Sequence, residues 1–127
     1  MGMNHLLDTN ILIYLDKGIS DPNAVAFLSE ATADGAVISI ITEIELLGFN
    51  FPSAVDLQKM EELINDATVL PLDKAIAEQT INIRRKYKIK LPDAIIAATA
   101  LVHGLTLVTR NIADFNAIDN LLLVDPF

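Results

Sequence analysis

The sequence predicts an α/β fold, a three-layer α/β/α sandwich built on a central, mainly parallel sheet. Short and nearly continuous apolar runs recur along the chain, as expected of strands that are buried on both faces. Helical patterns with start and stop signals separate these runs, and strands that alternate with helices form parallel βαβ units with right-handed crossovers. The expected strands are Asn4–Leu7, Ala36–Ile38, Thr68–Leu70, Thr106–Val108 and Leu121–Val124.

Capping residues and helix-spaced apolar residues define the expected helices. Between the first two strands, Asp21-Pro22 supplies a cap and a first-turn proline, and Gly35 lies where a C-terminal glycine belongs. Before the fourth strand, Pro92 starts a helix rich in Ala and Ile that ends at Gly104. The remaining helices are expected to start near Asn10, at Ser39 or Thr42, at Ser53, and at Asp73, the last one running to about Tyr87.

Composition limits the classes of protein that fit. The 127 residues suffice for a single domain over residues 1–127, and the absence of cysteine excludes disulfides, thiolate catalysis and sulfur-based zinc sites. A net charge of −8 argues against generic nucleic-acid binding, so any contact with nucleic acid has to be local. No apolar run reaches the roughly 20 residues of a membrane span, and the first residues do not form a signal-peptide pattern, so a cytoplasmic protein is expected.

Four carboxylates lie where expected strands stop or the next helices start. Asp8 follows the first strand, Glu45 comes shortly after the second, Asp93 opens the helix before the fourth, and Asp114 follows the fourth. If the strands are parallel, the four acids converge at one edge of the sheet, where open α/β sheets place their active sites. Oxygen ligands without cysteine or paired histidine suit Mg²⁺ or Mn²⁺, and such a cluster supports phosphodiester hydrolysis.

Each acid also has a purely structural interpretation. Asp8 could cap the following helix, Asp93 is electrostatically comfortable in a first helical turn, and Asp114 could form a turn. Glu45 lies among apolar residues, whereas Glu43 points about 200° away around the same helix and cannot face the same site. The conjunction of all four acids at the carboxyl ends of the strands favours the functional interpretation.

Four segments, whose order and spacing cover almost the whole chain, form one pattern: Leu7–Ile13 (LDTNILI), Ser39–Gly48 (SIITEIELLG), Leu91–Ala100 (LPDAIIAATA) and Leu107–Phe115 (LVTRNIADF). Together they resemble the PIN domain, and more narrowly the VapC-like ribonuclease toxins of prokaryotic toxin-antitoxin pairs. The resemblance implies a Mg²⁺- or Mn²⁺-dependent endoribonuclease that is commonly a homodimer and is inhibited by a cognate antitoxin protein.

Position by position, the resemblance assigns the catalytic and metal-binding acids as Asp8, Glu45, Asp93 and Asp114. A Thr-x-x-Glu-Leu pattern selects Glu45 over Glu43. Members often carry an acid where Asn111 stands here, so either Asn111 is a neutral ligand or Asp114 supplies the charge at the fourth corner. Polar residues that match those around the family's metal and water are Thr9, Asn10, Thr109 and Asn111; caps and turns explain them equally well.

Basic side chains are concentrated in residues 84–90, immediately before Asp93. This segment holds five of the nine Lys and Arg residues, and it could hold RNA phosphates beside the metals. Charge complementarity at a helix end and a solvated loop explain it equally well. The candidate RNA-binding residues are Arg84, Arg85, Lys86, Lys88 and Lys90.

A hydrophobic fraction of 52% is high for so small a domain and predicts apolar surface covered by partners. The expected surface for a homodimer and an antitoxin comes from the first two helices, at residues 11–15 and 24–27.

Two other classes of protein compete with the nuclease. A phosphoacceptor signalling domain of the receiver type typically has adjacent acids after its first strand and a lysine after its last. Here Thr9 follows Asp8, and no lysine lies near Val124. The second alternative is a catalytically silent PIN-fold binding module, which would bind divalent ions without cleaving RNA.

Overall fold

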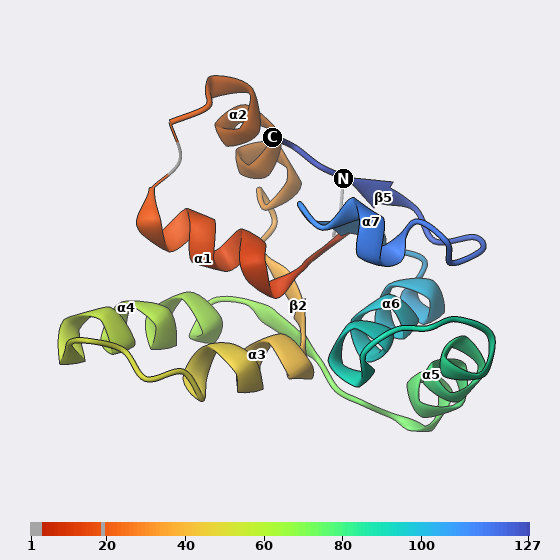
Figure 1. The fold of residues 1–127 in the computed structure, drawn as a ribbon. Helices are drawn as coiled ribbons and strands as arrows, with labels where there is room; N and C mark the ends of the chain where they lie inside the picture. The colour runs from red at the N-terminus through yellow and green to blue at the C-terminus, as the bar shows by residue number, and fades with distance from the viewer. Residues whose placement is uncertain (1–3, 19) are drawn as a thin grey trace.

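The computed structural model describes residues 4–18 and 20–127, in which strands alternate with helices or helix pairs (Figure 1). The strands are β1 (His5–Leu7), β2 (Val37–Ser39), β3 (Thr68–Leu70), β4 (Thr106–Val108) and β5 (Leu123–Val124). The helices are α1 (Thr9–Lys17), α2 (Pro22–Ala31), α3 (Ile40–Leu47), α4 (Ala54–Asn65), α5 (Lys74–Lys86), α6 (Leu91–His103) and α7 (Ile112–Phe115). Every strand expected from the sequence is present, although β5 is shorter than predicted.

The strands pair in parallel throughout the part of the chain that the structure describes. β4 lies between β1 and β5, β2 pairs with β3, and β1 packs beside β2, which gives the spatial order β3-β2-β1-β4-β5. Leu7 at the end of β1 lies opposite Val108 at the end of β4. The next residues, Asp8 and Thr109, therefore meet at the same edge. Ligands bind at this carboxyl edge in open α/β sheets, at the point where the strand order reverses.

Helices cover both faces of the strands, with α1 to α4 on one side and α5 to α7 on the other (Figure 1). Consecutive strand residues point to opposite faces. Leu6 and Leu107 accordingly join the core beneath α5, α6 and α7, whereas Leu7 and Val108 join the core beneath α1 to α4. Residues 94–100 of α6 are all buried. The three-layer α/β/α arrangement predicted from the sequence is confirmed.

Side-chain caps start α2 to α5 at the predicted positions. Asp21, Ser53 and Asp73 each accept a hydrogen bond from a first-turn backbone N–H. Ser39 caps α3, so Thr42, the alternative start, lies inside that helix. The prediction for α2 was too long: the helix ends at Ala31. Gly35, at a φ of 103°, closes the turn that follows, donating its N–H to the Thr32 carbonyl at 2.9 Å.

A short helix, α7, occupies the region where a turn was one interpretation of the sequence. Its anchor is Phe115, which is 1% exposed and belongs to the core beneath α5 to α7. Four residues contain about one helical turn, too short for a periodic pattern to be detected. Its consequence for the site is that Asp114 projects from a packed element at the carboxyl edge. None of the helices in residues 4–18 and 20–127 has the length and hydropathy of a membrane span.

Candidate active site

Asp8 is the most deeply buried of the four acids, with a residue exposure of 5%. It leaves β1 in an extended conformation and caps α1, because its Oδ1 accepts the backbone N–H of Thr9 at 2.8 Å. Its Oδ2 accepts the hydroxyl of Thr109, which follows β4, at 2.7 Å. The structural and functional interpretations of Asp8 are thus compatible, since the same carboxylate caps a helix and faces the edge of the sheet.

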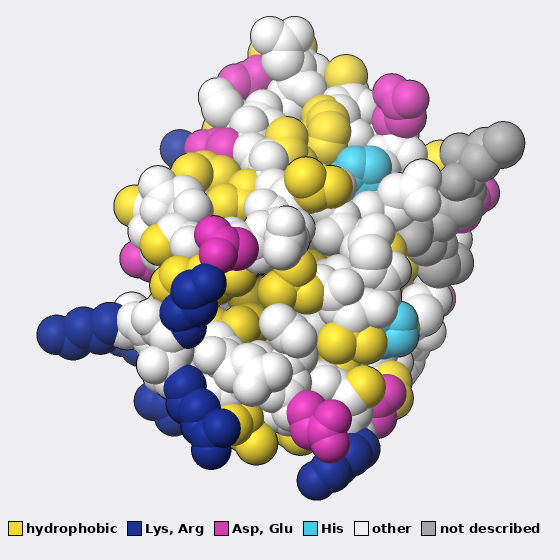
Figure 2. Space-filling model, turned by 90° about the vertical axis from the view of Figure 1, so that its right-hand side faces the viewer, with side chains coloured by type: hydrophobic (Ala, Val, Ile, Leu, Met, Phe, Trp, Pro, Cys, Tyr) yellow, Lys and Arg dark blue, Asp and Glu magenta, His cyan; other side chains and the backbone are white. Residues whose placement is uncertain are grey.

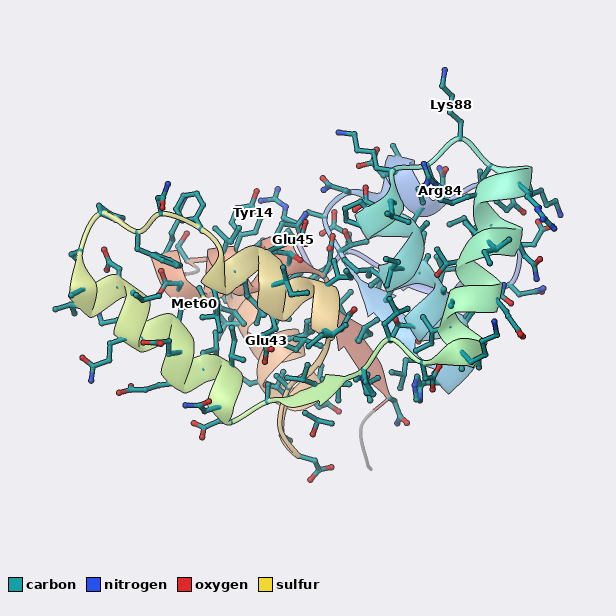
Figure 3. All side chains as sticks on the ribbon, turned by 90° about the horizontal axis from the view of Figure 1, so that it is seen from below. Tyr14, Glu43, Glu45, Met60, Arg84 and Lys88 are labelled. Atoms are coloured by element: carbon teal, nitrogen blue, oxygen red, sulfur yellow. The ribbon has the colours of Figure 1, made fainter. Side chains whose placement is uncertain are left out.

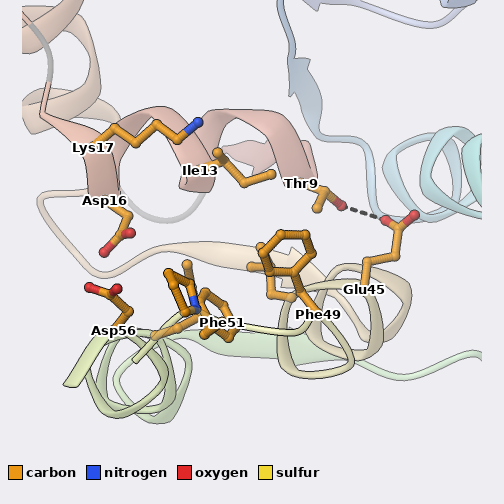
Figure 4. A pocket seen from close by; sticks show the side chains of 11 residues that line it. Thr9, Ile13, Asp16, Lys17, Glu45, Phe49, Phe51 and Asp56 are labelled. Atoms are coloured by element: carbon orange, nitrogen blue, oxygen red, sulfur yellow. Dashed lines mark hydrogen bonds between the residues drawn. The ribbon is translucent and has the colours of Figure 1, made fainter. Parts of the chain in front are cut away.

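Thr9 links the first strand to α3. Its hydroxyl donates to Oε1 of Glu45 at 2.6 Å, an interaction visible in Figure 4. The same Thr9 oxygen lies 2.9 Å from the hydroxyl of Thr42, which is fully buried. Because the single Thr9 proton goes to the carboxylate, the Thr42 hydroxyl donates to Thr9. These two hydrogen bonds hold Glu45 toward Asp8, while Glu43 lies on a different side of α3 (Figure 3).

The other two acids approach from the opposite layer. Asp93 lies half-buried in the first turn of α6, and Asp114 is exposed on α7. Burial is the main cause that raises the pKa of Asp93, and the negative charges of Asp8, Asp114 and Glu45 raise it further. Burial also raises the pKa of Asp8, and the charges of Glu45 and Asp114 add to this increase. The hydrogen bonds from Thr109 and Thr9 act in the opposite direction and lower it. The four predicted acids therefore interact as one electrostatic cluster.

The remaining polar candidates divide by role. The backbone N–H of Asn111 donates to the Thr109 hydroxyl at 3.0 Å, so Asn111 orients the residue that holds Asp8. Asn111 is exposed and starts α7 without a side-chain cap, which leaves its amide available at the same edge. Oδ1 of Asn10 is buried and has no hydrogen-bond partner among the residues that the structure describes.

A divalent cation fits this donor set. No three Asp, Glu or His side chains in residues 4–18 and 20–127 stand close enough together to form a complete metal cage. Mg²⁺ does not require one, because it usually takes one or two carboxylates and keeps several waters. The donors are oxygens only, and a cation beside them would offset the burial and the repulsion that together raise the pKa of Asp8 and Asp93.

The basic segment of residues 84–90 does not act as one patch. Lys88 and Lys90 line a groove of about 460 Å³ together with Asp93 and Asp114. Arg84 and Arg85 line a neighbouring groove, which Lys88 also borders, but they are not among the residues that line the groove with the acids. Lys86 binds Asp119. Figure 2, which views the molecule from the side of α5 and α6, shows Lys and Arg gathered along one edge of this face.

A second groove lies on the opposite side of the acids, between α1 and the connection from α3 to α4. It has a volume of about 570 Å³ and includes Thr9 and Glu45. Phe49 and Phe51 line it, with their ring centroids 5.2 Å apart in an edge-to-face arrangement (Figure 4). This groove was not predicted from the sequence. An available signal was the pair of aromatic residues in a short connection between two helices, one of which, Phe49, is 63% exposed.

The apolar surface expected on the first helix needs a correction. Ile11 and Leu12 are at most 1% exposed and belong to the core, because they lie on the face of α1 that packs on the sheet. Ile13 and Tyr14, on the other side, are 38% and 36% exposed. Val25 of α2 is also exposed, whereas Ala24 is buried. Only part of each predicted segment is therefore available to a partner.

Comparison with known proteins identifies the family. Residues 5–121 match the family model of the PIN domain, and the chain belongs to the PIN domain family. This membership removes the support for a receiver-type signalling domain. A comparison with curated proteins gives no significant match.

Several solved structures contain a chain with the same fold. A chain of a toxin-antitoxin complex from Klebsiella pneumoniae is 35% identical, with a TM-score of 0.78 over 97% of this chain and 98% of that chain. DNA-bound VapBC from Salmonella typhimurium contains a chain that is 26% identical, with a TM-score of 0.84 over 99% and 100% of the two chains. FitAcB from Neisseria gonorrhoeae contains one that is 26% identical, with a TM-score of 0.80 over 96% and 97%.

Proposed function

We propose that this PIN-domain protein is a divalent-metal-dependent endoribonuclease and the toxin component of a toxin-antitoxin pair. The observation that carries the proposal is the cluster of interacting acids around Asp8 at the carboxyl edge of the sheet. Family membership and the likeness to chains of toxin-antitoxin complexes support it.

In the proposed mechanism, Asp8 and Asp93 would hold a Mg²⁺ or Mn²⁺ ion, and Glu45 and Asp114 would assist them or hold a second ion. A bound ion of this kind lowers the pKa of water toward neutrality and neutralises charge on the phosphodiester. Thr109 keeps the Asp8 carboxylate oriented through its 2.7 Å hydrogen bond. Thr9 does the same for Glu45. Because the carboxylates are held by hydroxyl groups before the reaction, little rearrangement is needed when substrate binds.

The test is an RNA digest with purified protein in the presence and absence of Mg²⁺ or Mn²⁺. We expect cleavage that depends on the metal and is abolished in Asp8→Asn and in Asp93→Asn, with circular dichroism spectra unchanged. Glu43→Gln is the matched control, since Glu43 lies in α3 but on a different side from Glu45 (Figure 3). Full cleavage by Asp8→Asn would remove that residue from the mechanism. Metal binding without cleavage of any RNA class would favour a catalytically silent module.

The partners proposed are a second copy of the chain and a cognate antitoxin. The exposed apolar side chains of α1, α2 and the Phe49–Phe51 connection provide surface for such contacts. Light scattering on the purified protein tests the homodimer, and a monomeric mass at micromolar concentration would contradict it. Adding the product of an adjacent small gene to the RNA digest tests the antitoxin, which should suppress cleavage stoichiometrically.

A further inference from the structure

The segment between α5 and α6 alternates between inward and outward residues. Tyr87 and Ile89 are half-buried and pack against the core beneath α5 to α7. Lys88 and Lys90 are exposed, and Lys88 projects from the ribbon (Figure 3). Backbone angles are extended at both ends of the segment, at Tyr87 and Lys90. Because consecutive residues of an extended chain point in opposite directions, this conformation presents both lysines on the same side.

The base of this segment is anchored to the loop after α7. The Lys86 ammonium lies 2.8 Å from the carboxylate of Asp119. The backbone N–H of the same Asp119 donates to the Tyr87 hydroxyl at 3.1 Å. The Lys86 charge also lies 5.4 Å from the centre of the Tyr87 ring. Lys86 is thereby assigned to holding the segment in place, which leaves Lys88 and Lys90 as the cations that face the groove.

The groove joins these lysines to the acid cluster. Lys88 and Lys90 line it together with Asp93 and Asp114, and its apolar lining includes Ile89 and Ile118. Lys86–Asp119 is the ion pair found among residues 4–18 and 20–127, so neither groove lysine forms an ion pair within those residues. The charge of Lys90 nevertheless acts on Asp93, whose pKa it lowers against the larger effect of burial. Carboxylates that hold a cation beside free ammonium groups form a surface suited to a chain of phosphates.

The groove on the other side of the cluster has the opposite character. Its charged residues are Asp16, Asp56 and Glu45 against the single cation Lys17, and its walls include Phe49 and Phe51. Such a lining repels phosphates. The two flanks of the acid cluster therefore differ in sign, which restricts the course that a nucleic-acid strand can take.

We propose that Lys88 and Lys90 bind the RNA phosphates next to the scissile one, so that the strand runs along the groove between residues 87–90 and α7. This inference rests on the proposed ribonuclease function and assigns positioning residues to it. The acidic, aromatic groove does not carry the RNA backbone. Arg84 and Arg85, although they belong to the same basic segment, take no part.

The test compares two double variants that remove the same charge. Lys88→Ala with Lys90→Ala should raise KM for a single-stranded RNA about tenfold at physiological salt, with kcat changed less than about twofold. The slope of log(kcat/KM) against log[salt] should become shallower by about 1.4, since each lost phosphate contact on a single strand is worth about 0.7. Arg84→Ala with Arg85→Ala should leave KM and the slope unchanged. Lys88→Arg with Lys90→Arg should restore the wild-type slope.

Two results would overturn the assignment while leaving the ribonuclease proposal intact. One is an equal change of slope in both alanine pairs, which would mean that net charge alone matters. The other is an unchanged slope in Lys88→Ala with Lys90→Ala. Failure of the ribonuclease proposal is recognised separately, by wild-type protein that cleaves no RNA with Mg²⁺ or Mn²⁺. In that case RNA binding is measured instead, by fluorescence anisotropy of labelled RNA with the wild-type protein and with each alanine double variant. Wild-type affinity in Lys88→Ala with Lys90→Ala would then overturn the assignment.

Discussion

Thr109→Val tests whether the buried hydroxyl at the end of β4 controls Asp8. Thr109 is fully buried, donates its hydroxyl to Asp8 at 2.7 Å and accepts the Asn111 N–H at 3.0 Å. Valine has nearly the same shape but can make neither contact. A hydrogen bond to an ionised group contributes about 1.5–3 kcal/mol, and an unpaired backbone N–H costs about 1 kcal/mol more. We expect the free energy of unfolding to fall by about 3 kcal/mol.

Urea denaturation at pH 7 without divalent metal measures this loss as a lower transition midpoint. Thr109→Ser keeps the hydroxyl and removes one methyl group, so it should cost only about 1 kcal/mol. Thr99→Val is a second control. Thr99 is equally buried, but its hydroxyl donates at 2.7 Å to the carbonyl of Ile95 in the same helix. When valine removes that hydroxyl, the Ile95 carbonyl still keeps its backbone hydrogen bond within the helix. Equal midpoints for Thr109→Val and Thr109→Ser would refute the reasoning.

Three further predictions concern the acids and α7. Asp93→Asn should stabilise the metal-free protein at pH 7. Burial and neighbouring charges raise the pKa of Asp93, so between about pH 3.9 and that raised pKa the folded chain binds more protons than the unfolded chain. Wild-type stability therefore falls as pH rises through that window. Urea titrations at several pH values check this, and an advantage that persists below that window would contradict it. Mg²⁺ at about one hundred times its Kd should add about 2.7 kcal/mol to wild-type stability and little to Asp8→Asn, as measured by thermal unfolding. Phe115→Ala should lower the free energy of unfolding by about 3–5 kcal/mol, because the phenylalanine side chain is 1% exposed. The control Asn116→Ala, at an exposed residue, should lower it by less than about 0.5 kcal/mol. Similar losses in the two variants would show that α7 is not anchored by its phenylalanine.

Local patterns in the sequence predicted most of the architecture. Buried strands appear as short apolar runs, and caps such as Asp21 and Asp73 act within three residues, so both are recorded in adjacent letters. The parallel arrangement follows from the alternation of strands and helices. That arrangement alone predicts a common edge for Asp8, Glu45, Asp93 and Asp114. α7 escaped prediction because a single helical turn contains too little periodic signal.

The sequence by itself determined the order of the elements, their caps and the acids that meet at the carboxyl edge. Only the tertiary structure decided which polar groups hold those acids, because the contact from Thr109 to Asp8 joins residues 101 positions apart. It also divided the basic segment between Lys86, bound to Asp119, and the lysines of the groove, and it created the groove around Phe49 and Phe51. Propensity and capping act over a few residues, whereas these contacts depend on how whole layers pack. Short-range patterns therefore predicted the fold, and long-range packing defined the site.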